Sequence, residues 1–178
     1  MRFVGKLLVV VGLLSLGACA PSPVRVAEPL PADAPITVVA FAVEPSGVHY
    51  EGSVDAMGLA LAGQIADTLR RRGRNAQVAS TPPVEGNGII VRGRITTIDG
   101  GSRATRFWVG FGAGGASVAA EGEVVRADGT QVAPFKAVRS SSGMADMFGG
   151  DSPVLVDKCV RAVAEDIAEM VATSHYDQ

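Results

Sequence analysis

Cysteine and histidine are scarce in this chain and its net charge is small, and each of these features argues against a class of protein or site. Two cysteines in 178 residues cannot form a disulfide-dense scaffold, and two histidines leave little for a histidine-built metal site. The formal net charge of −2 argues against a nucleic-acid-binding protein, which carries a basic excess. Hydrophobic residues nevertheless make up 47% of the chain, which excludes wholesale disorder and fits one folded domain with appendages.

The N-terminus has the layout of a secretory signal. Arg2 and Lys6 precede an uncharged stretch at residues 7–20, which is shorter than the about 20 helical residues that a membrane span requires. Within it, residues 16–19 read Leu-Gly-Ala-Cys, which resembles the lipobox of bacterial lipoproteins. This resemblance implies that residues 1–18 are removed, that diacylglycerol is attached to the Cys19 sulfur, and that the new amino group is acylated. The alternative is an ordinary secretory signal with a chance cysteine.

Firm membrane attachment is the expected consequence of lipidation. Each buried methylene contributes about 0.8 kcal/mol, so one acyl chain holds marginally whereas two or three hold firmly. The residue after the cysteine is Ala20. In enteric lipoproteins an aspartate at this position implies retention in the inner membrane, so alanine favours the outer membrane. Residues 19–35 contain five of the ten prolines, which predicts an extended tether that reaches roughly 50 Å.

The remaining chain is predicted to form a single α+β domain, residues 36–173, followed by a disordered tail at 174–178. Its expected sheet is mixed but mostly antiparallel, with about six strands and two helices. Continuous apolar runs or alternation mark the strands, and apolar residues at helical spacing mark the helices. The expected strands cover residues 36–43, 76–79, 89–98, 103–111, 116–124 and 131–139, and the expected helices begin near Ser53 and Pro153.

A few side chains predict how these elements begin, end and connect. Ser53 is the predicted cap of the first helix with Asp55 in its first turn, and Gly73 is the predicted residue just past its end. Because this helix joins the first two strands, a right-handed crossover between parallel strands is expected. Asp128-Gly129 predicts a hairpin turn, and Pro134, which has no N–H to donate, places the last strand at an edge or at a bulge.

A glycine-rich stretch at residues 110–115 is the most unusual feature of the sequence. Gly110, Gly112 and Gly115 satisfy the pattern G-x-G-x-x-G. A dinucleotide site needs a helix directly after this pattern, whereas the residues that follow alternate like a strand. A bend between two antiparallel strands is the favoured interpretation, and a seam for self-association or membrane contact is the alternative.

Several of these features together resemble a known family. Gly93, Arg106, the glycine-rich stretch, the Asp128-Gly129 turn and the Ser/Gly-rich stretch before the last helix resemble a family of bacterial lipoproteins catalogued as domain of unknown function 4410. The resemblance covers residues 36–171. It implies an envelope location and a similar fold, and it implies no particular activity.

Residues that could perform chemistry are few. His49 could be oriented by Glu51, but no nucleophile motif accompanies them, so a solvated histidine is favoured over a hydrolase site. Cys159 borders the apolar stripe of the last helix and is expected to be a small buried side chain, with an intermolecular disulfide as the alternative.

Arginines at positions 70, 71, 72 and 74 form a basic cluster. The negative end of the helix dipole explains most of it, and contact with anionic lipid or an envelope polymer is the alternative.

The sequence therefore predicts no catalytic, cofactor or metal site and one modified residue, Cys19. The favoured hypothesis is a non-enzymatic binding or assembly module, held by its lipid anchor at the periplasmic face of the outer membrane. Its expected partners are the membrane and an envelope protein or polymer, with no nucleic acid. The alternatives are an envelope hydrolase and a structural component that self-associates through the glycine-rich hairpin.

Overall fold

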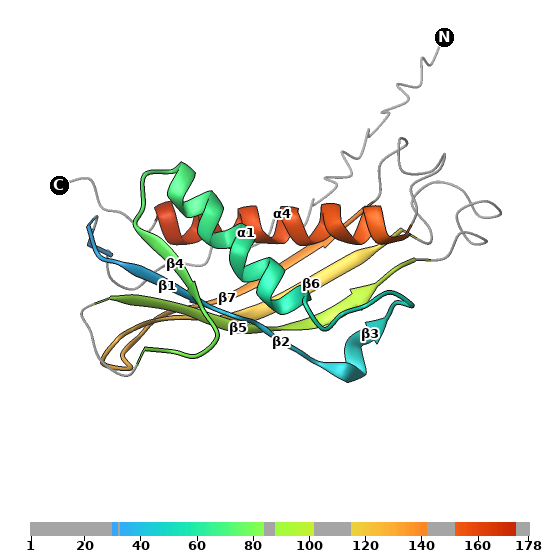
Figure 1. Ribbon diagram of the computed structural model, residues 1–178, viewed down its shortest axis with the longest axis horizontal. Coiled ribbons are helices and arrows are strands. Elements are labelled where there is room, and N and C mark those ends of the chain that lie inside the picture. The colour runs from blue at the N-terminus through green and yellow to red at the C-terminus, as the bar shows by residue number, and fades with distance from the viewer. Residues whose placement is uncertain (1–29, 32, 84–87, 102–114, 142–151, 174–178) are drawn as a thin grey trace, which may run out of the picture.

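The computed structural model describes residues 30–31, 33–83, 88–101, 115–141 and 152–173. Figure 1 shows the elements along the chain. In order they are β1 (Ile36–Val39), β2 (Ala42–Val43), the 3₁₀-helix η1 (Pro45–Gly47), β3 (Val48–His49), α1 (Met57–Arg71), β4 (Ala76–Ala79), β5 (Ile89–Asp99), β6 (Ser117–Arg126), β7 (Gln131–Ser140) and α4 (Ser152–Thr173). Neither of the described helices is long and apolar enough to cross a membrane.

The strands form one mixed sheet in the order β4-β1-β5-β6-β7, and β2 and β3 pair with β5 farther along its length. β1 is parallel to both β4 and β5, whereas the longer pairings of β5 with β6 and of β6 with β7 are antiparallel. The predicted α+β class, with two helices and a mixed sheet, is confirmed. α1 also connects the parallel strands β1 and β4, as the sequence predicts.

The sheet has seven strands rather than about six, mainly because the strand expected at residues 36–43 is divided. At the break, the Ala40 N–H donates to the Ala79 carbonyl at 2.9 Å and the Phe41 N–H donates to the Gly58 carbonyl at 3.2 Å. These bonds lead to β4 and to α1 rather than to β5, so the pairing with β5 is interrupted before β2. The two-residue strand β3 adds a further strand, and the strand expected at 103–111 lies outside the described residues.

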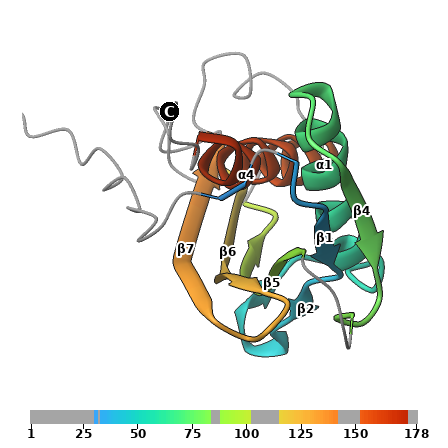
Figure 2. The same ribbon diagram turned by 90° about the vertical axis from the view of Figure 1, so that its left-hand side faces the viewer.

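Both helices lie on the same face of the sheet, as Figures 1 and 2 show. The large apolar side chains on their inner sides are fully buried, and each such side chain stabilises the fold by about 1.5–3 kcal/mol. They include Leu61, Ile65 and Leu69 from α1 and Leu155, Val163 and Ile167 from α4. The sheet contributes the other half of the core through β1, β5, β6 and β7.

The start of α1 differs from the prediction. Its N-cap residue is Ala56, and no side chain caps the helix. The prediction of Ser53 as the cap and Asp55 in the first turn is therefore wrong. Tertiary packing accounts for the later start, because Gly58 in the first turn lies directly against the backbone of Phe41.

The end of α1 follows the prediction. Gly73 has a φ of +78°, in the left-handed region that glycine adopts without strain. Its N–H donates to the Arg70 carbonyl at 2.9 Å, and the Arg74 N–H donates to the Leu69 carbonyl at 3.0 Å. These two bonds form a Schellman motif, which satisfies the last carbonyls of the helix.

The hairpin between β6 and β7 also matches the sequence. Gly129 has a φ of +88°, and the Asp128 carboxylate accepts a hydrogen bond from the Thr130 N–H at 2.8 Å. β7 is an edge strand, and the pairing register shifts opposite Val124 and Val125. Pro134 therefore lies in an edge strand close to a bulge, where a missing N–H is tolerated.

Two glycines make room for two aromatic rings at the centre of the core. Gly93 on β5 pairs directly with Gly122 on β6. The rings of Phe41 and Phe135 pack beside them, with centroids 6.1 Å apart and planes inclined at 43°. A Cβ at Gly93 would lie 2.9 Å from the Phe41 ring, and a Cβ at Gly122 would lie 2.7 Å from the Phe135 ring. The aromatic pair thus requires glycine at both positions.

Candidate functional site

The predicted lipidation site, Cys19, lies outside the described residues, so lipidation remains a prediction. Of the chain between Cys19 and the domain, the structure describes residues 30–31 and 33–35. Leu30 is 2% exposed and belongs to the main core, and Ala34 is also buried. Packing therefore begins at least as early as Leu30, within the tether that the sequence predicts up to residue 35.

The predicted basic cluster is largely engaged within the domain. Arg70 pairs with Asp67 at 2.5 Å, and its Nε donates to the Ala76 carbonyl at 2.8 Å. Arg71 donates to the Thr68 hydroxyl at 2.8 Å.

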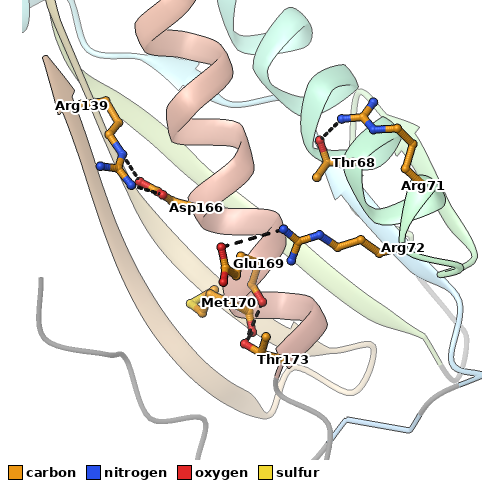
Figure 3. Close-up of polar contacts among 8 residues, drawn as sticks. All are labelled: Thr68, Arg71, Arg72, Arg139, Asp166, Glu169, Met170 and Thr173. Carbon is orange, nitrogen blue, oxygen red and sulfur yellow. Dashed lines mark hydrogen bonds and ion pairs between the residues drawn. The ribbon is translucent and has the colours of Figure 1, made fainter. Parts of the chain in front are cut away.

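Two further members of the cluster hold other parts of the fold. Arg72 reaches Glu169 of α4 at 3.9 Å, as Figure 3 shows. Arg74 is 6% exposed and donates to the Pro31 carbonyl at 3.0 Å. Contacts inside the domain therefore account for most of the cluster, alongside the helix dipole.

An ion pair connects the edge of the sheet to α4. The Nε of Arg139 donates to an Asp166 oxygen at 2.6 Å, and a second guanidinium nitrogen bonds the other carboxylate oxygen (Figure 3). This hydrogen bonding raises the pKa of the Arg139 guanidinium. Because the pair is two-pronged, it fixes the position of β7 relative to α4 as well as adding attraction.

The face of the sheet opposite the helices carries alternating charge. Arg92 on β5 pairs with Glu123 on β6 at 2.7 Å, and Arg94 pairs with Glu121 at 2.5 Å. Glu44, which follows β2, lies 3.6 Å from Arg94. All of these side chains are at least partly exposed, so each pair contributes at most about 1 kcal/mol. The arginines and glutamates on this face therefore largely neutralise one another, beside a small buried apolar cluster of Val39, Ile90 and Val125.

The remaining predicted residues are placed as follows. His49 is exposed and belongs to β3 rather than to a loop. Cys159 is 3% exposed, and its thiol contacts the Ala116 carbonyl at 3.6 Å, which confirms the expectation of a small buried side chain. Of the glycine-rich stretch at residues 110–115, all but Gly115 lie outside the described residues. No cluster of three or more potential metal ligands occurs in the described part of the chain.

A family model described as "Domain of unknown function (DUF4410)" matches residues 36–145. The chain belongs to the DUF4410 family. The resemblance noted in the sequence is thereby confirmed. No curated protein matches this DUF4410 chain.

This DUF4410 protein is similar to several solved structures at low sequence identity. It is similar to the PelC dodecamer from Paraburkholderia phytofirmans, with a TM-score of 0.53, 18% identity, and coverage of 87% of this chain and 98% of that one. A structure from Caulobacter crescentus presented as a lipoprotein gives a TM-score of 0.40 at 13% identity, covering 72% and 89% of the two chains. Lipoprotein B from Nitrosomonas europaea gives a TM-score of 0.30 at 10% identity, and the match covers 84% of this chain and 93% of that one.

Proposed function

We propose that this DUF4410 protein is a lipid-anchored, non-enzymatic assembly module at the periplasmic face of the outer membrane. The observation that carries the proposal is the lipobox-like sequence at residues 16–19, which places an acylatable thiol eleven positions before Leu30, a buried residue at the start of the described chain. Two or three acyl chains on such a cysteine hold a domain firmly at a bilayer. Ala20 after the cysteine favours the outer membrane.

The position of His49 supports a non-enzymatic role. A catalytic histidine needs a partner that orients it and a nucleophile within hydrogen-bonding reach. His49 and Glu51 are both exposed. Among the described residues, no hydrogen bond reaches either side chain. The pair is therefore not held in a catalytic arrangement.

One of the two edges of the sheet, β7, supports self-association as the mode of assembly. β7 pairs with β6 on one side, and no described strand pairs with its other side. Exposed strand edges are a common route to pairing between chains. Val138 on β7 is 56% exposed, which is unusual for a large apolar side chain in a strand. PelC, which shares this fold, forms a dodecamer.

The anchor is tested first. Cells grown with labelled palmitate should incorporate label into the natural protein and not into a Cys19→Ser variant. The natural protein should sediment with outer membranes, and the variant should remain in the periplasmic fraction. Membrane association of Cys19→Ser equal to that of the natural protein would contradict the proposal.

Assembly is tested by photo-crosslinking in living cells. A photoreactive amino acid replaces Val138 on β7 or, as a matched control, Leu59 on α1, which is 53% exposed. Crosslinks from Val138 to further copies of the chain support self-association, and crosslinks to another envelope component support a binding module. Equal, non-specific crosslinking from both positions would contradict a role for this edge.

A further inference from the structure

The first described residues form a short strap on the folded domain. The strap consists of Leu30, Pro31 and residues 33–35, and it leads directly into β1. Leu30 is 2% exposed within the main core, although it stands between two prolines in the sequence. A leucine side chain withdrawn from water in this way resists release of the segment that carries it.

Arg74 holds the strap from the other side. Its guanidinium is buried and donates to the Pro31 carbonyl at 3.0 Å. Burial lowers the pKa of this guanidinium, and the nearby Asp33 carboxylate partly offsets the shift. A buried guanidinium requires hydrogen-bond acceptors, so releasing the strap would remove one from a charged group.

Backbone hydrogen bonds complete the attachment. The Ala34 N–H donates to the Pro31 carbonyl at 3.3 Å, which forms a turn within the strap. The Ile36 N–H donates to the Asn75 carbonyl at 2.8 Å, and the Pro35 carbonyl accepts from the Ile89 N–H at 2.8 Å. The strap is thus fixed at the corner where α1 ends and where β1, β4 and β5 begin.

We propose that the strap is a latch, closed by Leu30 and Arg74, that sets both the exit point and the free length of the membrane tether. This inference rests on the proposed lipid anchor at Cys19. With the latch closed, the eleven residue steps from Cys19 to Leu30 span at most roughly 36 Å. If the latch opened up to Ile36, the tether would lengthen to about seventeen residues and roughly 56 Å. The strap therefore keeps the corner at the end of α1 close to the bilayer.

The latch itself is tested by hydrogen–deuterium exchange on the full chain in detergent. Leu30→Ser removes the buried side chain of the latch, and Arg74→Gln removes its guanidinium. Leu59→Ser is the control, at an exposed apolar position. Each latch variant should make the Ala34 amide exchange about tenfold faster or more, which corresponds to the loss of one buried contact. Amides of β6 report whether the domain remains folded. An Ala34 amide that exchanges at its unprotected rate in the natural protein would overturn the proposal, as would unchanged exchange in both variants.

The tether length is tested on vesicles that contain a headgroup quencher. A fluorophore is attached through a cysteine that replaces exposed Asn75, next to the strap. Leu30→Ser should reduce quenching relative to the natural sequence, and Leu59→Ser should not. Equal quenching with and without Leu30 would overturn the effect of the latch on the tether. The exchange experiment needs no lipid. If Cys19 carries no palmitate, the proposed anchor is wrong, but the exchange result still decides whether the latch exists.

Discussion

Replacement of Gly58 by alanine should destabilise the domain, although alanine is the better helix former. A Cβ at this position would lie 1.8 Å from the carbonyl oxygen of Phe41. The same two residues are joined by the hydrogen bond from the Phe41 N–H to the Gly58 carbonyl. Because the obstructing atom belongs to the backbone, no side-chain rotation relieves the contact. α1 would have to move by roughly 1.5 Å to restore an ordinary carbon–oxygen distance.

The expected magnitude follows from three effects. Overpacking a buried contact costs about 1–3 kcal/mol, and weakening the Phe41 hydrogen bond costs about 1 kcal/mol. The higher helix propensity of alanine offsets about 1 kcal/mol of this loss. We therefore expect Gly58→Ala to lower the free energy of unfolding by about 2 kcal/mol.

Gly63 provides a matched control in the same helix. A Cβ there meets no atom within 4 Å, so Gly63→Ala should raise the free energy of unfolding by about 0.5–1 kcal/mol. Thermal unfolding followed by far-ultraviolet circular dichroism, on a soluble form that lacks residues 1–19, compares the two variants. Their Tm values should differ by roughly 6–12 °C. The packing argument is refuted if Gly58→Ala melts at or above the Tm of Gly63→Ala.

Three further outcomes are expected elsewhere. Gly122→Ala would place a methyl group 2.2 Å from a backbone oxygen and 2.7 Å from an aromatic ring, so urea unfolding should show a loss of about 1–3 kcal/mol. Hydrogen bonds from the Thr130 N–H and hydroxyl lower the pKa of Asp128 from its ordinary value of 3.8. The stabilisation that these bonds give the folded state is therefore present above pH 3.8 and is lost as the pH falls through the lower folded-state pKa. An NMR titration should show a higher Asp128 pKa in Thr130→Val than in the natural protein. Arg139→Gln and Asp166→Asn should each lower stability by about 0.5–1 kcal/mol in chemical denaturation, because either change removes the same exposed pair.

The faces of the long strands could be predicted from the sequence because strand geometry is local. Alternate residues of a strand point to opposite sides, so the order of apolar and charged residues decides which side is buried. Val91 and Ile95 are buried, and Arg92 and Arg94 between them are exposed, as the pattern indicates. The turn at Gly73 was predictable for a similar reason, since its conformation depends on the residue itself.

The start of α1 could not be predicted in the same way. Ser53 has the side chain of a good cap, and nothing near it in the sequence argues against that role. The helix starts later because Gly58 meets Phe41, which is distant in the sequence, and the position of that contact depends on the whole fold. Tertiary packing here outweighs a local preference worth about 1 kcal/mol.

The strap was missed for a compositional reason. Five prolines in residues 20–35 predict an extended segment, and that average conceals a single buried leucine. The available signal was Leu30 itself, a large apolar residue in a tether otherwise made mainly of proline, small and charged residues. Arg74, which donates to the Pro31 carbonyl of the strap, was assigned to the basic cluster because its burial depends on the strap.

The topology separates the strap from the residues that flank the glycine-rich stretch. The strap enters β1 at Ile36, which pairs with Ile89 at the first residue of β5. The glycine-rich stretch lies between Asp99, at the last residue of β5, and Ser117, at the first residue of β6, and these two residues pair with each other. β5 has eleven residues, so its ends are roughly 33 Å apart. The strap and the two residues that flank the glycine-rich stretch, Asp99 and Ser117, therefore lie at opposite ends of the sheet.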